Sequence, residues 1–206
     1  MRDRQIASAK DIIMIIFLDF DGVTHTIQSS ELGYFQHVPA LEEVLREFPS
    51  VQIVISSSWR FFEDFEQLKS HFSPAFRERI IDVTPTLEPN WLHHARFLEI
   101  SAWLGKNDYW GDWIAIDDQY IEFPKIGEGL DLRIDRENFE IEKSYHPNLI
   151  WCHKRYGLRQ CNLDELRWRM ARCPELKATL VVAILAATIK AKTDLVARLG
   201  KYDGES

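Results

Sequence analysis

The strongest pattern in the chain is the stretch Ile12-Ile-Met-Ile-Ile-Phe-Leu-Asp19-Phe-Asp21-Gly22-Val-Thr-His25. Its seven consecutive apolar residues predict a strand that is buried on both faces, and such strands are typical of parallel α/β sheets. Because side chains alternate along a strand, Asp19 and Asp21 are expected on one side, and Gly22 permits a sharp turn after them. A buried strand therefore delivers two carboxylates to one edge of a sheet.

The closeness of Asp19 and Asp21 has a chemical consequence. Two neighbouring carboxylates repel each other, so either a cation lies between them or one of them holds a proton. A hard divalent cation prefers oxygen ligands, and Mg²⁺ is the natural candidate. The alternative is a strand that runs into an ordinary Asp-rich turn, because Asp and Gly are common turn residues. Taken alone, the stretch leaves both interpretations open.

Length and composition are those of one globular domain, with 206 residues, 46% hydrophobic and 28% charged. The formal net charge of −7 argues against non-specific binding to nucleic acid or acidic membranes. The three cysteines show no Cys-x-x-Cys spacing, so neither a disulfide framework nor a zinc site is indicated. The apolar run near the N-terminus is short and ends in Asp-Phe-Asp, which is typical of a strand rather than a signal peptide. We therefore expect a cytoplasmic protein.

A second buried strand is predicted over 51–55, and it runs directly into Ser56 and Ser57. Serine hydroxyls beside free backbone N–H groups at the start of a helix can cradle a phosphate. The alternative is that a serine here only caps a helix, for which Ser is a favoured residue. The local sequence does not choose between these two roles.

A further strand, predicted over 113–116, ends in Asp117 and Asp118. Open α/β sheets gather their ligand sites at the carboxyl ends of the strands. We therefore expect these two carboxylates to converge with Asp19, Asp21 and the serines, although they are far apart along the chain. Two or three carboxylates can hold Mg²⁺, or Asp118 can instead orient a metal-bound water.

The remaining periodicities complete one α/β domain over 1–206, with its core at about 12–170. Strands are expected over 79–83 and 148–152, and helices from Pro39, over 61–72, 91–105 and 162–172, and from Pro174 to about 199. The charged segment 119–147 is predicted to be an insertion, and about 174–200 a helical C-terminal extension. The uncharged part of that extension is shorter than a bilayer span requires, so no membrane segment is expected.

Taken in order, the chain carries a hydrophobic strand with Asp19-x-Asp21-Gly22, a strand-end Ser56, a basic Arg96 on a later helix, and a hydrophobic strand ending in Asp117-Asp118. This ordered set resembles the four motifs of the haloacid dehalogenase (HAD) superfamily. More narrowly, the chain resembles the HAD domain of Swiss Army Knife RNA repair proteins. The stretches that carry this resemblance are Phe17-Leu-Asp-Phe-Asp-Gly-Val-x-His25, Ser57-Ser58-Trp59-Arg60, Arg96-x-x-Glu99-Ile100-x-x-Trp103-Leu104 and Ile116-Asp-Asp118. The resemblance implies a Rossmann-like three-layer fold with a central, mostly parallel sheet.

The same resemblance implies a Mg²⁺-dependent phosphatase, a phosphoric monoester hydrolase that works through an aspartyl-phosphate. Asp19 would attack phosphorus, and Asp21 would act first as general acid and then as base. The metal would be held by Asp19, the main-chain carbonyl of Asp21, and Asp117, with Asp118 as a further ligand or as a partner of its water. Arg96 and Ser56, or Ser57 in its place, would bind the phosphoryl oxygens. The superfamily usually has Lys where Arg96 stands, whereas Arg is expected within the narrower resemblance.

The spacing of the motifs leaves no room for a large cap domain, so an open site is expected. By resemblance, an open site suits a phosphate on a macromolecular end, such as RNA or DNA, or a nucleotide. The basic and aromatic residues of 153–172 could track a nucleic-acid backbone, or could be the solvated face of a helix. His25 is close enough to Asp21 to touch substrate, although loop histidines are more often exposed.

Two other classes of function remain open at this point. A phosphorylation-receiving signalling module also groups acidic residues at strand ends, but two acidic pairs on two strands fit it poorly. A non-catalytic nucleic-acid- or protein-binding domain that retains the HAD fold is the other alternative. The clustered like charges argue against it, because they would destabilise a domain that has no use for them. Neither the oligomeric state nor the natural substrate is predicted.

Overall fold

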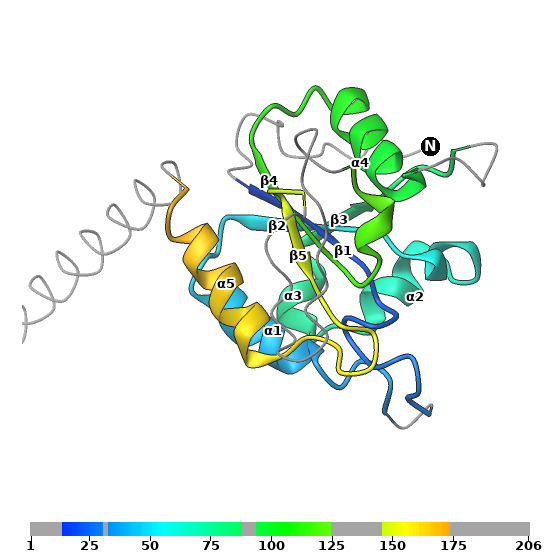
Figure 1. Cartoon of the computed structure of the whole chain (residues 1–206), viewed down its shortest axis with the longest axis vertical. Coiled ribbons are helices and arrows are strands. Elements are labelled where there is room, and N and C mark those ends of the chain that lie inside the picture. Colours follow the sequence, from blue (N-terminus) through cyan, green and yellow to red (C-terminus); the bar gives the residue numbers. More distant parts are fainter. Residues whose placement is uncertain (1–13, 31–32, 88–93, 125–145, 174–206) are drawn as a thin grey trace, which may run out of the picture.

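The centre of the molecule is a five-stranded sheet in which every pair of neighbours is parallel, in the order β3-β2-β1-β4-β5 (Figure 1). The computed structural model describes residues 14–30, 33–87, 94–124 and 146–173. The strands are β1 Met14–Leu18, β2 Val51–Ile55, β3 Ile80–Val83, β4 Asp112–Asp117 and β5 Leu149–Trp151. Parallel neighbours need crossover connections, and helices supply them on both faces of the sheet.

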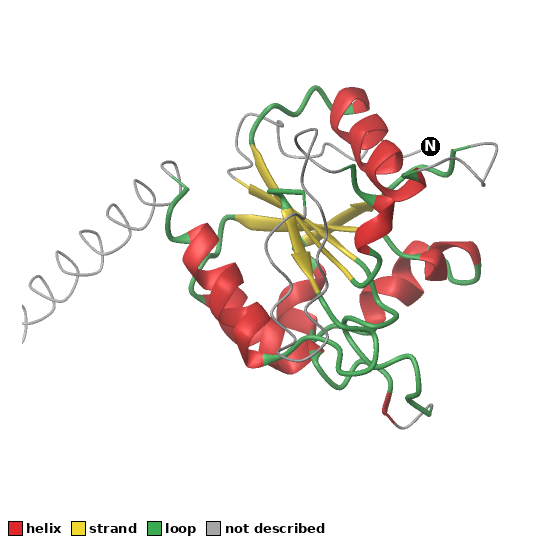
Figure 2. Ribbon diagram, in the orientation of Figure 1, coloured by secondary structure: helices red, strands yellow, loops and turns green. Residues whose placement is uncertain are grey.

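Helices cover the two faces unequally (Figure 2). One face carries α1 Val38–Arg46, α2 Phe65–Ser70, α3 Pro74–Arg77 and α5 Gln160–Met170, whereas the opposite face carries α4 Ala95–Lys106. Two short 3₁₀ helices, η3 Ser58–Phe61 and η4 Tyr120–Glu122, follow the ends of β2 and β4. The result is the three-layer, Rossmann-like α/β architecture expected of a HAD fold.

The apolar run of β1 divides the interior into two cores. Met14, Ile16 and Leu18 pack into the core under α1 and α5, and Ile15 and Phe17 pack into the core under α4. All five side chains are at most 3% exposed. A strand that is covered on both faces has no polar side, which explains why its sequence is a continuous apolar run rather than an alternating one.

Most predicted elements are confirmed to within about two residues, but the helix predicted over 91–105 starts at Ala95, and the single helix predicted over 61–72 is wrong. The chain instead forms η3 and then starts α2 at Phe65. The break occurs because Asp64 accepts a hydrogen bond from the N–H of Gln67 (2.9 Å), while the Gln67 side chain accepts one from the N–H of Asp64 (2.8 Å). This reciprocal capping box fixes a new helix start. The short helix α3 was not predicted.

Some predictions fall partly outside the described residues, namely most of the 119–147 insertion and the C-terminal helix from Pro174. Within the described ranges, the connections from β1 to β2 and from β2 to α4 hold short helices, turns and β3, and no cap domain. None of the described helices is both long and apolar enough to cross a membrane. None of the three cysteines, Cys152, Cys161 and Cys173, forms a disulfide in the part of the chain that is described.

Candidate active site

The parallel register brings the predicted site residues to one edge of the sheet. The N–H of Asp19 donates to the carbonyl of Ile116 (3.0 Å), and the N–H of Ser56 donates to the carbonyl of Leu18 (2.8 Å). The residues that follow β1, β2 and β4 therefore lie side by side although they are widely separated in sequence. This edge is the carboxyl edge, where open α/β sheets hold their ligands.

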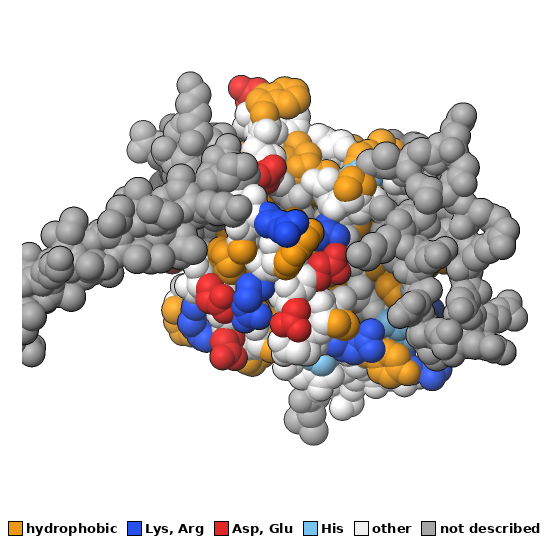
Figure 3. Space-filling view, turned by 60° about the vertical axis from the view of Figure 1, so that its left-hand side comes forward, with side chains coloured by type: hydrophobic (Ala, Val, Ile, Leu, Met, Phe, Trp, Pro, Cys, Tyr) orange, Lys and Arg blue, Asp and Glu red, His pale blue; other side chains and the backbone are white. Residues whose placement is uncertain are grey.

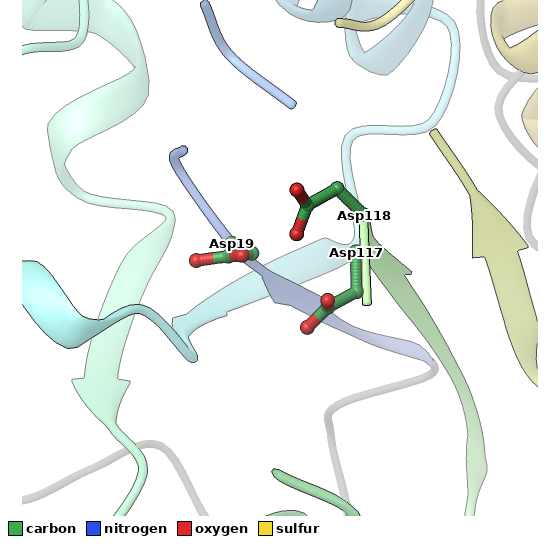
Figure 4. Close-up of side chains that lie close together, drawn as sticks. All are labelled: Asp19, Asp117 and Asp118. Atoms are coloured by element: carbon green, nitrogen blue, oxygen red, sulfur yellow. The ribbon is translucent and has the colours of Figure 1, made fainter. Parts of the chain in front are cut away.

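Three carboxylates gather at this edge: Asp19, Asp117 and Asp118 (Figure 4). Each offers one oxygen, and these oxygens all lie within 4.8 Å of one another. Asp19 and Asp117 are 3% and 2% exposed, and the Oδ1 atom of Asp118 is buried without a hydrogen-bond partner among the described residues. A set of hard oxygen donors with an unsatisfied buried oxygen fits a divalent cation such as Mg²⁺.

The electrostatics of the cluster point the same way. Burial raises the pKa of Asp19, and it raises the pKa of Asp117 well above the usual range, with repulsion from Asp19 as the next cause. Burial and the charge of Asp19 raise the pKa of Asp118 to about 6. Each carboxylate is therefore costly to keep charged in this place, and a bound cation would relieve that cost.

Arg96 lies in the first turn of α4 and is the positive group nearest to the cluster within the described chain. Its Nε lies 3.1 Å from Oδ2 of Asp117, and its Nη2 lies 3.6 Å from Oδ1 of Asp19. Its Nη1 donates to the main-chain carbonyl of Ser56. Arg96 therefore offsets part of the negative charge and fastens the end of β2 to the carboxylates.

A second arginine, Arg60, also binds the backbone of the serines at this edge. Nη1 of Arg60 donates to the carbonyl of Ser57 (2.6 Å), and Nη2 lies 2.7 Å from Oε1 of Glu99. The Arg60 side chain is 5% exposed, so this ion pair is shielded from water. Arg96 and Arg60 together hold the carbonyls of both serines, which fixes the backbone that presents the two hydroxyls.

The hydroxyl groups of Ser56 and Ser57 differ in their hydrogen bonds. Ser57 is the N-cap of η3, and its Oγ accepts a long hydrogen bond (3.5 Å) from the N–H of Trp59. Ser56 is 1% exposed, and its Oγ has no hydrogen-bond partner among the described residues. A buried hydroxyl without a partner is a free donor for a ligand oxygen. Ser57 thus caps η3 and also hydrogen-bonds to Asp19, which acts to lower the pKa of that carboxyl, whereas the unsatisfied hydroxyl belongs to Ser56.

Asp21 is in a different environment from the other three carboxylates. Its side chain is 48% exposed, and both of its oxygens accept or share hydrogen bonds. Nε1 of Trp59 donates to Oδ2 (3.1 Å), and Nε2 of His25 lies 3.0 Å from Oδ1. The hydrogen bond with His25 is the main cause that lowers the pKa of Asp21. The carboxylate of Asp21 is not part of the metal-type cluster, so a ligand role for its main-chain carbonyl stays a prediction.

His25 is 1% exposed, so the expectation of an exposed loop histidine is wrong. The hydroxyl of Thr24 donates its one proton to the carbonyl of Phe20 (3.0 Å), so its 3.2 Å contact with Nδ1 of His25 requires the proton of that nitrogen. The other nitrogen, Nε2, is left facing Asp21.

Gly22 is required by the turn that follows Asp21. Its φ of +69° lies in the left-handed region that favours glycine. A Cβ atom at this position would overlap the carboxyl group of Asp118. The close approach of the two loops is therefore possible only because residue 22 has no side chain.

Sequence reasoning missed the roles of Trp59, Arg60 and Glu99, which it quoted only as parts of motifs. Trp59 and Asp21 are 38 residues apart, and no spacing rule connects them. The Arg60–Glu99 pair likewise joins η3 to α4. The only available signal was that polar and aromatic residues follow directly after a strand end.

The basic and aromatic segment 153–172 divides into two parts. On α5, Arg167 pairs with Glu47 (2.8 Å) and Arg169 with Glu165 (2.5 Å), and positive and negative side chains alternate over that face (Figure 3). These arginines are engaged in ion pairs, and Arg169 also donates to the main-chain carbonyl of Leu149 (3.0 Å). The loop after β5 lies at the carboxyl edge instead, where the N–H of Ile27 donates to the carbonyl of Lys154 (3.1 Å).

Comparison with known proteins agrees with this geometry. A family model described as the HAD domain in Swiss Army Knife RNA repair proteins matches residues 15–163. No curated protein and no solved structure matches the chain. The family match covers most of the 206 residues and includes all of the site residues above. The chain therefore belongs to the family of HAD domains found in Swiss Army Knife RNA repair proteins.

Proposed function

We propose that this protein is a Mg²⁺-dependent phosphohydrolase that acts through an aspartyl-phosphate on Asp19. The observation that carries the proposal is the meeting of three carboxylates and one guanidinium at the carboxyl edge of the sheet, next to the serines that follow β2. Phosphoryl transfer mainly requires positioning and charge stabilisation, and these groups can supply both.

In the first step, a carboxylate oxygen of Asp19 attacks the phosphorus atom of a phosphate monoester. The bond between phosphorus and the ester oxygen breaks, and its electron pair stays on the departing oxygen. Asp21 gives that oxygen a proton, so the leaving group departs as an alcohol. The half-exposed side chain of Asp21 is suited to this role because a group that reaches solvent can reach a leaving group.

In the second step, a water molecule attacks the phosphorus of the aspartyl-phosphate. Asp21, now a carboxylate, takes one proton from that water. The bond between phosphorus and the Asp19 oxygen breaks, which releases inorganic phosphate and restores the Asp19 carboxylate. One residue thus serves as acid and then as base, and the proton balance of the full cycle closes.

The carboxylates of Asp19, Asp117 and Asp118 are the residues that would hold Mg²⁺. When bound, the ion would neutralise negative charge on the phosphoryl oxygens. Ser56 would donate its free hydroxyl to one of those oxygens. Arg96 already lies 3.6 Å from Asp19, so a phosphoryl group on that carboxylate would come within reach of its guanidinium.

We further propose that the substrate is an accessible phosphate, such as a nucleic-acid end or a nucleotide. Two exposed aromatic side chains lie at the end of η3, the helix that follows the serines, Phe61 at 54% and Phe62 at 85% exposure. Exposed rings beside a phosphate site can stack on bases. Within the described residues, the connections from β1 to β2 and from β2 to α4 are short and hold no cap domain.

The proposal is tested by measuring phosphate release, with and without Mg²⁺, from 3′- and 5′-phosphorylated oligonucleotides, mononucleotides and an aryl phosphate. We expect Mg²⁺-dependent release by the native chain and none by Asp19→Asn. Preference for oligonucleotide ends over the aryl phosphate would support the substrate class.

Two results would contradict the proposal. Release that persists in Asp19→Asn would rule out Asp19 as the nucleophile. No release from any substrate by a folded, Mg²⁺-binding native chain would favour the alternative, a non-catalytic domain that binds nucleic acid or protein.

A further inference from the structure

The carboxyl group of Asp21 is held on both of its oxygens by side chains from two different loops. His25 contacts Oδ1 (3.0 Å) from the turn after β1, and Trp59 donates to Oδ2 (3.1 Å) from η3. Both lengths are those of well-formed hydrogen bonds. With two contacts in place, the carboxyl group has no freedom to rotate about its χ2 bond without losing one of them.

The two supporting side chains are themselves fixed by packing. The ring of His25 lies between Tyr34 (5.0 Å between ring centroids), Phe35 (5.2 Å) and Trp59 (5.6 Å). Its Nδ1 is occupied by Thr24. Only the edge that carries Nε2 is left to face Asp21, so the direction of that contact is set by the surroundings of the ring.

Trp59 is fixed in the same way from its other sides. Its indole packs edge-on against Phe20 (5.9 Å between centroids), Phe35 (5.1 Å) and His71 (5.6 Å). His71 is held in turn by Glu63 (2.7 Å). A half-exposed aspartate is therefore held by a partly buried aromatic cluster, which an ordinary surface carboxylate does not have.

We infer that His25 and Trp59 are positioning residues that aim the carboxyl group of Asp21 at the leaving oxygen of the substrate. The inference rests on the proposed function, in which Asp21 transfers protons. A proton donor is effective only within hydrogen-bond reach of the departing atom, and an error of about 1 Å can cost about 10²-fold in rate. Neither residue is assigned contact with the reacting atoms.

The test uses kcat/KM, which reports the steps through release of the leaving group. An alkyl phosphate needs a proton on its leaving oxygen, whereas an aryl phosphate with an acidic phenol leaves without one. We expect Trp59→Phe and His25→Leu to lower kcat/KM for the alkyl phosphate about 10- to 100-fold, and to change that for the aryl phosphate less than about threefold. His25→Gln keeps an N–H donor and should recover part of the loss.

A double-mutant cycle separates positioning from general damage. In an Asp21→Asn background the proton donor is already absent, so adding Trp59→Phe should cost nothing further on the alkyl phosphate. Trp110→Phe is the matched control. It removes another indole donor to an aspartate, the contact of Trp110 with Asp108 (2.7 Å), in the loop that leads into the amino end of β4.

Each outcome supports or overturns the inference. Equal losses on both substrates, or a full additional loss in the Asp21→Asn background, would mean that the two residues only maintain the fold. If His25→Leu does not fold, Trp59→Phe alone carries the test. An inactive native chain would instead refute the proposed function, and the inference with it, whereas an active native chain with uniform losses would refute the inference alone.

Discussion

Two neighbouring carboxylates of one turn, Asp19 and Asp21, are placed in opposite environments. Asp19 is 3% exposed and belongs to a cluster with Asp117 and Asp118. Asp21 is half exposed and is held by two hydrogen bonds. Burial raises the pKa of Asp19, and the hydrogen bond with His25 lowers the pKa of Asp21. The raised pKa favours the protonated form of Asp19 and the lowered pKa the carboxylate form of Asp21, so position and exposure, rather than these directions, distinguish the tasks of the two residues.

The environments of Asp19 and Asp21 differ because the two side chains contact different parts of the fold. Asp19 is fastened to the interior by the carbonyl of Ile116 and by Arg96, so it is surrounded by other strand ends. Asp21 is two residues further on, past the last ladder bond, and its carboxyl group hydrogen-bonds to Trp59 and His25. We therefore assign Asp19 to the covalent step, and Asp21 to proton transfer.

The largest expected effect separates these two tasks. Asp19→Asn should lower phosphate release by on the order of 10⁴-fold or more, because the nucleophile is lost. Asp21→Asn should lower it by about 10²- to 10⁴-fold. With a good leaving group, Asp21→Asn should also accumulate the aspartyl-phosphate, because the base for its hydrolysis is missing. Intact mass after acid quenching measures the added phosphoryl group.

The native chain, quenched during turnover, is the control for that measurement. A phosphoryl adduct in Asp19→Asn would show that another residue is the nucleophile. If neither Asp21→Asn nor the native chain carries an adduct, turnover does not pass through a covalent intermediate.

The next effect concerns the serines beside the nucleophile. Ser56→Ala removes an unpartnered hydroxyl and should lower kcat by about 10²-fold, as the loss of one transition-state donor does. Ser57→Ala removes the N-cap of η3 and a hydrogen bond to Asp19, and should lower the free energy of unfolding by about 1 kcal/mol and kcat less than Ser56→Ala does. Steady-state kinetics and thermal unfolding of both variants give the comparison. The reverse pattern would assign phosphate binding to Ser57.

The sequence was sufficient to predict the strands because each one is a local apolar run. Val51–Ile55 is observed with the predicted bounds, and β1 and β4 end where their acidic pairs begin. We predicted that these strand ends converge from one general rule about parallel sheets, because no sequence pattern indicates the contacts between them. The position of the site was thus predictable from local patterns and one rule of topology.

The contacts within the site were not predictable in this way. The hydrogen bond from Trp59 to Asp21 and the ion pair of Arg96 with Asp117 join residues that only the packed fold brings together. The direction of a side chain at a turn depends on the elements that pack against it. The periodicity of the sequence does not indicate which elements these are. The start of α2 is different. Asp64 and Gln67 have the three-residue spacing of a capping box, so this helix start was predictable from the sequence, although it was not predicted.

A smaller expected effect is the stabilisation by bound Mg²⁺, which should depend on the carboxylate cluster and not on the Asp21 carboxylate. Mg²⁺ at about 100 times its Kd should stabilise the native chain by about 2.7 kcal/mol, and Asp117→Asn should remove most of this gain. Asp21→Asn should keep most of it, because the Asp21 carboxylate lies outside the cluster. Thermal unfolding during a Mg²⁺ titration measures the gain. An equal loss in both variants would contradict the division into two environments.

The smallest expected effect is a difference in stability that depends on pH, measured in a chelator. The folded pKa of Asp118 is raised to about 6 from 3.8, so the folded chain binds this proton more tightly than the unfolded chain. Stability from this group is present at low pH and is lost as the pH rises from about 4 to about 6. Asp118→Asn avoids the loss and should be more stable above pH 6 by about 1–2 kcal/mol, after allowance for solvent screening.

Asp21 should behave with the opposite sign in the same experiment. Its pKa is lowered in the folded state, so its contribution to stability is present above the unfolded pKa and is lost as the pH falls through the folded one. Asp21→Asn should therefore be less stable than the native chain near pH 7, and the two should converge in acid. Denaturant unfolding at a series of pH values measures both variants. Effects of the same sign would mean that Asp118 and Asp21 share one electrostatic environment after all.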